Sequence, residues 1–222
     1  MIKIMFDKNV IIGSAFGFAH FTTTKICGDM KDISARNAFL SSLKINPQSL
    51  VFAKQIHSAS VKIVSKKDGG SFLDGCDGLI SGEKDLAVGI FTADCMPVLL
   101  SSKDGAVRAA VHCGWKGLAS GILENAVGIF NSGFGAKAKD ICAYIAPHIK
   151  ECCYEVGKEF EEIFNIKLKS SKLNMAEIAR ASLKKSGVTN ISVCGECTFC
   201  SRDKFFSYRK NKTDKRQLTV ML

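Results

Sequence analysis

The chain has 222 residues, of which 46% are hydrophobic and 23% are charged, as in ordinary globular proteins. This composition excludes a disordered or collagen-like chain, and no uncharged stretch reaches the roughly 18 apolar residues that a membrane-spanning helix requires. The formal net charge of +10 favours an anionic partner, such as nucleic acid, a membrane surface or a phosphorylated small molecule.

The N-terminal segment superficially resembles a secretion signal, because lysines precede a weakly apolar stretch. Asp7 interrupts that stretch, and Gly13-Ser14 breaks the apolar run that follows, so we expect one or two strands here. Without a convincing signal, the ten cysteines indicate reduced thiols in the cytoplasm and not a disulfide framework.

Apolar spacing and turn residues predict the following elements in chain order. Strands are expected at Leu50–Ile56, Val61–Val64, Gly78–Ser81, Leu86–Thr92, Pro97–Ser101, Ala106–His112, Ile141–Ile145, Ile191–Val193 and Leu218–Met221. Helices are expected at Asp32–Leu43, with Asp32 as the N-cap, and at Leu118–Phe130, Glu155–Phe164 and Leu173–Ser186. Lys103-Asp104-Gly105 predicts a hairpin between its two flanking strands. The order lacks regular βαβ alternation, which favours one α/β domain with a mixed sheet over residues 1–222.

Two groups of cysteines have a spacing that invites a metal. Cys194, Cys197 and Cys200 form C-x-x-C-x-x-C, which is typical of zinc or iron–sulfur sites, and Cys152 is adjacent to Cys153. A fourth cysteine at matching distance is missing, and Thr198-Phe199 has the composition of a strand. We therefore favour a thiol cluster without metal and keep a second metal site as the alternative.

Three potential metal ligands stand at the ends of apolar strands. His57 and His112 each close one predicted strand, and Cys95 follows a third. Side chains at the strand ends of one sheet can converge, and two imidazoles with one thiolate suit zinc with a fourth position open to water. Zinc in such a site makes its bound water more acidic, which is the basis of catalysis at neutral pH. The intervals form no local motif, so polar caps on core strands and a buried thiol remain the alternative.

Two further segments suit an anion. Gly114-Trp115-Lys116-Gly117 opens the predicted helix after His112, where backbone N–H groups and Lys116 could face a phosphate, although such glycines also serve tight turns. Residues 202–216 contain seven basic and two acidic residues, half of the net charge, and include Phe205-Phe-Ser-Tyr-Arg209. Aromatic rings beside Arg209 suit stacking with phosphate contact, and an aromatic core segment beside a solvated basic surface is the alternative.

Read together, these segments resemble one family. The motifs are Lys54-Gln-Ile-His57-Ser, Asp77-Gly-Leu-Ile-Ser, Thr92-Ala-Asp-Cys95-Met-Pro, Ala110-Val-His112-Cys-Gly-Trp-Lys-Gly, Cys153-Tyr-Glu-Val, Glu196-Cys-Thr and Phe205-Phe-Ser-Tyr-Arg209. Their order is similar to that of the YfiH-type family, labelled laccase-domain or polyphenol oxidase and also understood as purine nucleoside phosphorylases. The resemblance covers roughly residues 50–222.

This resemblance implies a single α/β domain with mixed sheets flanked by helices, and a zinc site of His57, Cys95 and His112. It implies phosphorolysis of adenosine, inosine, guanosine and methylthioadenosine, together with adenosine deamination, so purine nucleosides and phosphate are the expected partners. A polyphenol oxidase with copper in the same site is the alternative, although one site suits multi-copper chemistry poorly. A nucleic-acid-binding module that uses the basic C-terminal segment ranks lower.

We expect catalytic roles for His57, Cys95, His112 and Asp94, with Asp77 as a second candidate for the acid or base. Substrate or phosphate contacts are expected from Gln55, Lys116, Arg209 and Lys25. Lys25 stands in this set because the N-terminal Thr-Arg-Gly-Gly of the family is replaced here by Thr23-Thr24-Lys25-Ile26-Cys27. The family's Asn-Arg corresponds to Asn37-Ala38, with Arg36 adjacent.

Overall fold

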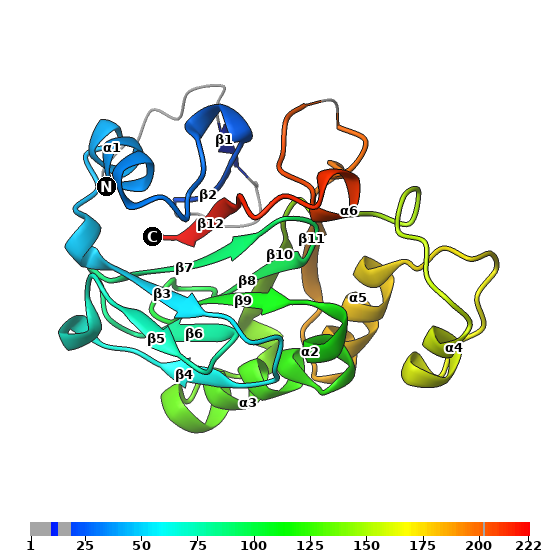
Figure 1. The fold of residues 1–222 in the computed structure, drawn as a ribbon. Coiled ribbons are helices and arrows are strands. Elements are labelled where there is room, and N and C mark those ends of the chain that lie inside the picture. The colour runs from blue at the N-terminus through cyan, green and yellow to red at the C-terminus, as the bar shows by residue number, and fades with distance from the viewer. Residues whose placement is uncertain (1–9, 13–18, 202) are drawn as a thin grey trace.

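The computed structural model describes residues 10–12, 19–201 and 203–222, whose strands form two six-stranded mixed sheets (Figure 1). The first sheet has the order β1 (Val10–Ile11), β2 (His20–Thr23), β12 (Gln217–Met221), β7 (Ala87–Thr92), β3 (Leu50–Lys54) and β5 (Phe72–Asp74). The second has the order β11 (Asn190–Val193), β10 (Ile141–Ile145), β8 (Met96–Ser102), β9 (Arg108–Cys113), β6 (Gly78–Ser81) and β4 (Val61–Ile63). Parallel and antiparallel neighbours occur in both sheets, which confirms the predicted α/β class with mixed sheets.

The helices lie outside the two sheets (Figure 1). They are α1 (Ile33–Ser42), α2 (Trp115–Ala119), α3 (Ile122–Phe134), α4 (Glu159–Phe164), α5 (Met175–Lys185) and α6 (Tyr208–Asn211), with single 3₁₀ turns at Lys25–Cys27, Pro47–Ser49, Lys66–Asp68 and Ala138–Asp140. Asp32 caps α1 as predicted, because its side chain accepts a hydrogen bond from the backbone N–H of Ala35. Within the described ranges, no helix combines the length and apolar character needed to cross a membrane.

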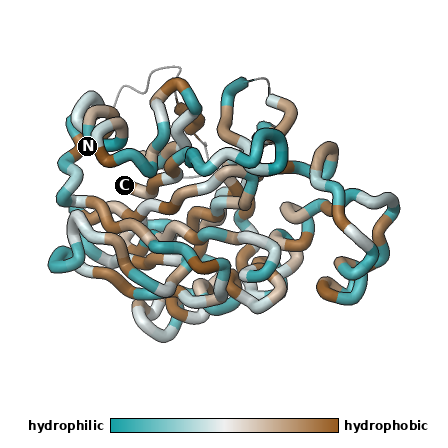
Figure 2. The backbone as a smooth tube through the Cα atoms, viewed as in Figure 1, coloured by the Kyte–Doolittle hydropathy of each residue, from teal (hydrophilic) through white to brown (hydrophobic). Residues whose placement is uncertain are grey.

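Three apolar clusters build the core in layers. One lies between α1 and the first sheet, the second between the two sheets, and the third between the second sheet and helices α3 and α5. Hydrophobic residues are concentrated on the strands, and hydrophilic ones on the outer turns (Figure 2). Burial of these apolar faces fixes the two sheets against one another, so loops at one common edge hold constant positions.

Several predicted boundaries agree with the structure. Strands β6 and β10 have the predicted bounds, and β8 and β9 are antiparallel neighbours across the predicted hairpin. The prediction of strands in the first residues falls mostly on residues 1–9 and 13–18, outside the described part, with β1 between them.

Three predicted elements are wrong in their extent or type. The helix expected over Leu118–Phe130 is divided into α2 and α3, because Gly121 adopts a left-handed conformation with φ of 81° between them. The helix expected over Glu155–Phe164 begins only at Glu159, since Glu155 pairs with Lys172 in an isolated β-bridge. The strand expected at Thr198-Phe199 is a turn.

Candidate metal centre and adjoining cavity

His57, Cys95 and His112 lie together, with their potential ligand atoms all within 4.8 Å of one another. His57 lies in the loop after β3, Cys95 lies where the chain passes from β7 to β8, and His112 lies near the end of β9. The expectation that one sheet supplies all three is wrong. Strands β3 and β7 belong to the first sheet and β8 and β9 to the second, so the group forms where the two sheets meet.

Asp77, directly before β6, holds two of these ligands in position. Its buried carboxylate accepts hydrogen bonds from the backbone N–H of His57 at 2.9 Å and of Ser58 at 2.7 Å. It also contacts His112 Nδ1 at 2.8 Å, and the Asp77 carbonyl accepts the backbone N–H of His112 at 2.6 Å. One carboxylate therefore fixes the loop conformation of His57, whose φ is +61°, and the ring orientation of His112.

Asp77, Cys95 and His112 each favour the charged form of their neighbours in this group. Burial alone would raise the pKa of Asp77, but His112 and Ser58 hold the pKa well below its usual range. Burial would likewise raise the pKa of Cys95, yet hydrogen bonds from His112 and His57 lower it to about 6. Burial opposes the charged form of His112, and its partners Asp77 and Cys95 nevertheless raise the pKa of His112 to about 9. The thiolate form of Cys95 is thus favoured at neutral pH.

The donor set fits a divalent metal ion. His112 Nδ1 is engaged by Asp77, which leaves Nε2 for an ion in the carboxylate–histidine–metal arrangement common in proteins. The contacts from both imidazoles to Cys95 Sγ occupy the space between the three donors, and a cation there would replace them. Two nitrogens and one sulfur suit zinc and also copper, and three protein ligands leave one further position.

Two glycines bring α2 against this group. A Cβ on Gly114 would lie 3.3 Å from the His57 ring and 3.6 Å from Cys95 Sγ, and one on Gly117 would lie 2.7 Å from the Ser58 carbonyl oxygen. The glycines of the Gly-Trp-Lys-Gly motif therefore permit close packing. The expected anion turn opens the five-residue helix α2 and not the long helix that was predicted.

A cavity of about 320 Å³ adjoins Cys95. Its walls come from the Cys95 loop, the start of α2, the segment after β10, and helices α5 and α6. They comprise Ala93, Asp94, Cys95, Met96, Cys113, Gly114, Trp115, His148, Ile149, Tyr154, Met175, Tyr208, Arg209 and Lys212. Aromatic rings and two cationic side chains thus face the same space as the thiolate.

Asp94 joins the cavity wall to distant parts of the chain. Its carboxylate accepts hydrogen bonds from Thr198 Oγ1 at 2.7 Å, from Ser207 Oγ at 2.9 Å and from the backbone N–H of Arg209 at 2.7 Å. Its backbone has a φ of 88°, a conformation that costs on the order of 1–3 kcal/mol for a residue other than glycine. These bonds hold that conformation, which directs Cys95 toward the two histidines.

Of the four predicted substrate contacts, Arg209 alone lines this cavity. It stacks on Tyr154 at 5.3 Å and donates to the Glu155 carbonyl oxygen. Gln55 uses both ends of its side-chain amide on the backbone of Phe91, and exposed Lys116 lies over its neighbour Trp115. Lys25 pairs with Asp203 at 3.1 Å and lines a separate depression.

Arg36 packs inside the protein and does not line the cavity. It is buried over the rings of Phe52, Phe72 and Phe91, at 5.1–5.8 Å from their centroids, and donates to the Met30 carbonyl oxygen. It therefore stabilises the packing of α1 on the first sheet.

Sequence reasoning missed several cavity residues. Lys212 lies three positions after Arg209 in the basic segment, and that proximity was the available signal. His148 carried no signal at all. It is buried in the wall with Nδ1 donating to the Ala146 carbonyl oxygen, and burial lowers the pKa of His148 to about 4. It is therefore neutral at physiological pH.

Comparison with known proteins identifies the relatives of this chain. A family model described as multi-copper polyphenol oxidoreductase laccase matches residues 14–222. A purine nucleoside phosphorylase of Clostridium acetobutylicum is 39% identical in an alignment 175 residues long, and this alignment covers 75% of this chain and 73% of that protein. Purine nucleoside phosphorylase YfiH of Escherichia coli is 32% identical in an alignment 208 residues long, which covers 88% of this chain and 83% of that one.

Solved structures agree with these matches. The hypothetical protein YfiH of Bacillus licheniformis superposes with a TM-score of 0.83 at 26% identity, covering 90% of this chain and 91% of that one. YlmD of Geobacillus stearothermophilus gives 0.86 at 25% identity, covering 94% and 93%. The fold, the ordered motifs and the match over residues 14–222 lead to one conclusion: the chain belongs to the laccase-domain family that includes YfiH and proteins named purine nucleoside phosphorylase.

Proposed function

We propose that this protein is a zinc-dependent purine nucleoside phosphorylase, with adenosine deaminase activity in the same site. The observation that carries the proposal is the open side of the His57, Cys95 and His112 group, which adjoins a cavity with aromatic and cationic walls. Adenosine, inosine, guanosine and methylthioadenosine are the proposed substrates, and inorganic phosphate the co-substrate. We assign the reaction to one catalytic domain that comprises the whole chain.

The cavity walls suit the two parts of the reaction. Trp115, Tyr154 and Tyr208 offer ring faces on which a purine can stack. Arg209 and Lys212 supply positive charge for phosphate, and Arg209 is oriented by its backbone bond to Asp94. Holding phosphate beside the sugar C1′ turns a bimolecular displacement into a positioned one.

We assign the remaining side chains as follows. Zinc, when bound by His57, Cys95 and His112, would supply Lewis acidity toward a purine or an attacking water. Asp77 keeps the His112 ring fixed and balances its charge. Asp94 is a positioning residue and not the general acid or base, because three donors already engage its carboxylate. Of the predicted substrate contacts we keep Arg209, replace Lys25 and Lys116 by Lys212, and treat Gln55 as a brace for Phe91.

The deciding assay incubates the folded, zinc-replete protein with adenosine, with and without phosphate. We expect adenine and ribose 1-phosphate only when phosphate is present, and inosine under both conditions. His57→Ala and Cys95→Ala are expected to abolish both reactions, with Asp74→Asn as an exposed control. Absence of all three products from zinc-replete protein would overturn the proposal.

The family description favours one second candidate, a copper-dependent polyphenol oxidase. The N₂S donor set suits copper, but coupled copper centres draw on many histidines and the chain has four in total. Metal analysis after purification without added metal separates the two, since copper with phenol oxidation would support the oxidase.

The nucleic-acid-binding alternative ranks below both the phosphorylase and the oxidase, because Arg209 and Lys212 of the basic segment line the cavity. Salt-sensitive binding to generic DNA would favour it.

We also propose a reducing cytoplasm as the location. All ten cysteines are free thiols, and Cys95 must stay reduced to act as a ligand.

A further inference from the structure

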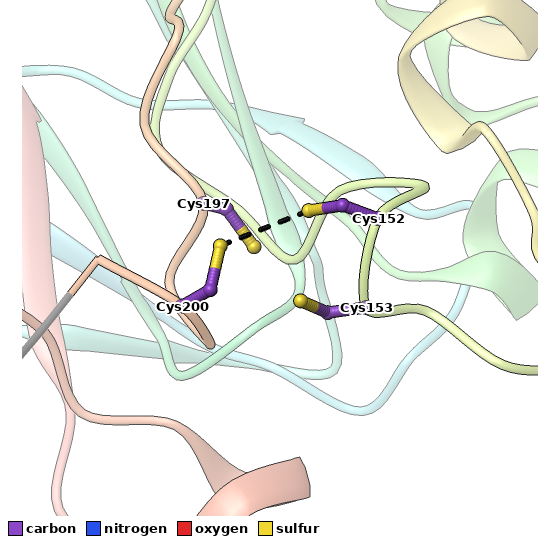
Figure 3. A group of neighbouring side chains, drawn as sticks. All are labelled: Cys152, Cys153, Cys197 and Cys200. Atoms are coloured by element: carbon purple, nitrogen blue, oxygen red, sulfur yellow. Dashed lines mark hydrogen bonds between the residues drawn. The ribbon is translucent and has the colours of Figure 1, made fainter.

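Four cysteines that the proposed reaction does not use meet at one point. The sulfur atoms of Cys152, Cys153, Cys197 and Cys200 all lie within 4.8 Å of one another. Figure 3 shows that two of them come from the loop after β10 and two from the segment after β11, with their sulfur atoms turned toward a common centre. The adjacent cysteines Cys152 and Cys153 thus supply the further thiols that the C-x-x-C-x-x-C motif lacked for a four-ligand site. Cys194, the first cysteine of that motif, stands outside the group.

The spacing of the sulfur atoms suits a single metal ion. Zinc bonds to thiolate sulfur are about 2.3 Å long, so the edge of a tetrahedral ZnS₄ site is about 3.8 Å. The Cys152 and Cys200 sulfur atoms are 3.8 Å apart. Four cysteines with one C-x-x-C pair form a ligand set typical of structural zinc.

The surroundings suit a thiolate site with negative charge. The backbone N–H of Lys150 donates to Cys197 Sγ, with a distance of 3.4 Å between the nitrogen and the sulfur. Four thiolates around Zn²⁺ leave a net charge of −2. Lys150 and Lys172 bring two ammonium groups to this region, where they donate to the carbonyl oxygens of Cys194 and Cys152.

We propose that Cys152, Cys153, Cys197 and Cys200 bind one structural Zn²⁺, separate from the ion at His57, Cys95 and His112. All four positions are taken by protein ligands, so this ion has no place for substrate or water. None of the four cysteines lines the cavity beside Cys95.

The second ion would fasten two segments that build the cavity wall. The first segment contributes Ile149, whose backbone N–H donates to the Asp94 carbonyl oxygen, and the second contributes Thr198, whose hydroxyl donates to the Asp94 carboxylate. An isolated β-bridge between His148 and Cys197 also joins the two segments. A zinc ion that joins Cys152 to Cys200 would thus hold together the two segments whose hydrogen bonds fix Asp94.

The test is zinc stoichiometry by elemental mass spectrometry after dialysis against a chelator. We expect two zinc ions per wild-type chain and one in Cys197→Ser and in Cys200→Ser. Cys194→Ser, the matched control from the same motif, should keep two, and Cys95→Ala should keep one. Equal zinc content in wild type and Cys200→Ser, or a disulfide between Cys152 and Cys200 in freshly purified protein, would overturn the proposal.

A second measurement first examines the site with all four cysteines in place, so it does not depend on the folding of their variants. Cobalt is loaded into folded Cys95→Ala protein, in which this site alone is expected to remain. We expect the d–d bands of tetrahedral cobalt and thiolate-to-cobalt charge-transfer bands, and we expect both to disappear in Cys95→Ala/Cys200→Ser with unchanged circular dichroism. An octahedral cobalt spectrum would overturn the four-thiolate site, and iron at the expected stoichiometry would overturn its assignment to zinc.

Discussion

The two groups of potential metal ligands in this protein differ in how the fold holds them. His57 and Cys95 come from two connections and His112 from the end of strand β9, at the junction of two sheets, and buried Asp77 links the two histidines. The four-cysteine group comes from two surface segments, where Cys152 and Cys200 are exposed and only Cys197 is fully buried. Cys95 of the first group lines the cavity, and none of the four cysteines of the second group lines it.

The two groups would therefore use zinc for two different purposes, one catalytic and one structural. Three donors held by a rigid junction leave one coordination position facing a cavity, as a reaction requires. Four thiolates on two surface segments fill every position, so the ion can only hold the segments together. Loss of the first ion should therefore remove activity with little change in stability, and loss of the second should do the reverse.

The strongest test of this contrast removes a ligand of the open site. We expect Cys95→Ala to reduce adenosine phosphorolysis to background and to lower the zinc content by one ion per chain, because the remaining two imidazoles bind zinc weakly. Activity and metal content are measured on the same sample, with circular dichroism as the control for folding. Normal turnover with one zinc lost would contradict the assignment.

A smaller effect is expected when the support of a ligand is changed. Asp77→Asn keeps the size of the side chain but removes the charge beside His112, and such changes typically lower metal affinity or activity about 10- to 100-fold. The measurement is kcat at saturating zinc together with the zinc dissociation constant. Asp74→Asn, which removes an exposed carboxylate paired with Lys54, is the matched control and should have no effect. An unchanged zinc affinity in Asp77→Asn would show that the carboxylate does not act through the metal.

Loss of the ion at the four-cysteine site should lower the stability of the protein and leave its catalytic rate nearly unchanged. We expect Cys197→Ser to lower the melting temperature by roughly 10 °C, since an ion present at a thousand times its dissociation constant contributes about 4 kcal/mol. Its kcat at 25 °C should stay within about ten-fold of wild type, because the ion acts on the cavity wall only through Asp94. Scanning calorimetry and activity on one preparation check both statements. A melting temperature equal to that of wild type would contradict a structural role.

The smallest expected effect lies at the open side of the cavity. Lys212→Ala should raise KM for phosphate about five-fold with kcat nearly unchanged, as expected for one exposed charge contact worth about 1 kcal/mol. Lys25→Ala should leave both constants unchanged, because Lys25 faces Asp203 outside the cavity. Initial rates at varied phosphate check this pair, and a larger effect for Lys25→Ala would reverse our assignment of the phosphate side.

The sequence predicted those features that depend on local patterns. Residues 78–81 and 141–145 form the predicted strands, and Asp32 caps its helix, because the local sequence carries most of the signal for these elements. The division of the predicted helix at Gly121 was missed, since glycine does not disturb an apolar period and its left-handed conformation depends on packing.

The site was predictable to the extent that strand ends carry its ligands. His57, Cys95 and His112 each terminate or follow an apolar run, but their origin in two different sheets depends on long-range topology. The four-cysteine group was missed because its halves lie 44 positions or more apart, joined only after β10 and β11 become parallel neighbours. Tyr154 and His148 reach the cavity because they follow β10, whose antiparallel pairing with β8 brings this segment beside Cys95.

The position of β12 has a consequence for how the protein is made. This strand lies between β2 and β7, and it is the element through which β1 and β2 join the rest of the first sheet. Thr22 and Thr219, which hydrogen bond across that junction, are separated by 197 residues. A ribosome releases the early strands long before their neighbour exists, so the first sheet closes only after residue 221 has emerged. A product that ended at residue 216 would retain every proposed ligand and yet lack β12, the strand that completes the sheet.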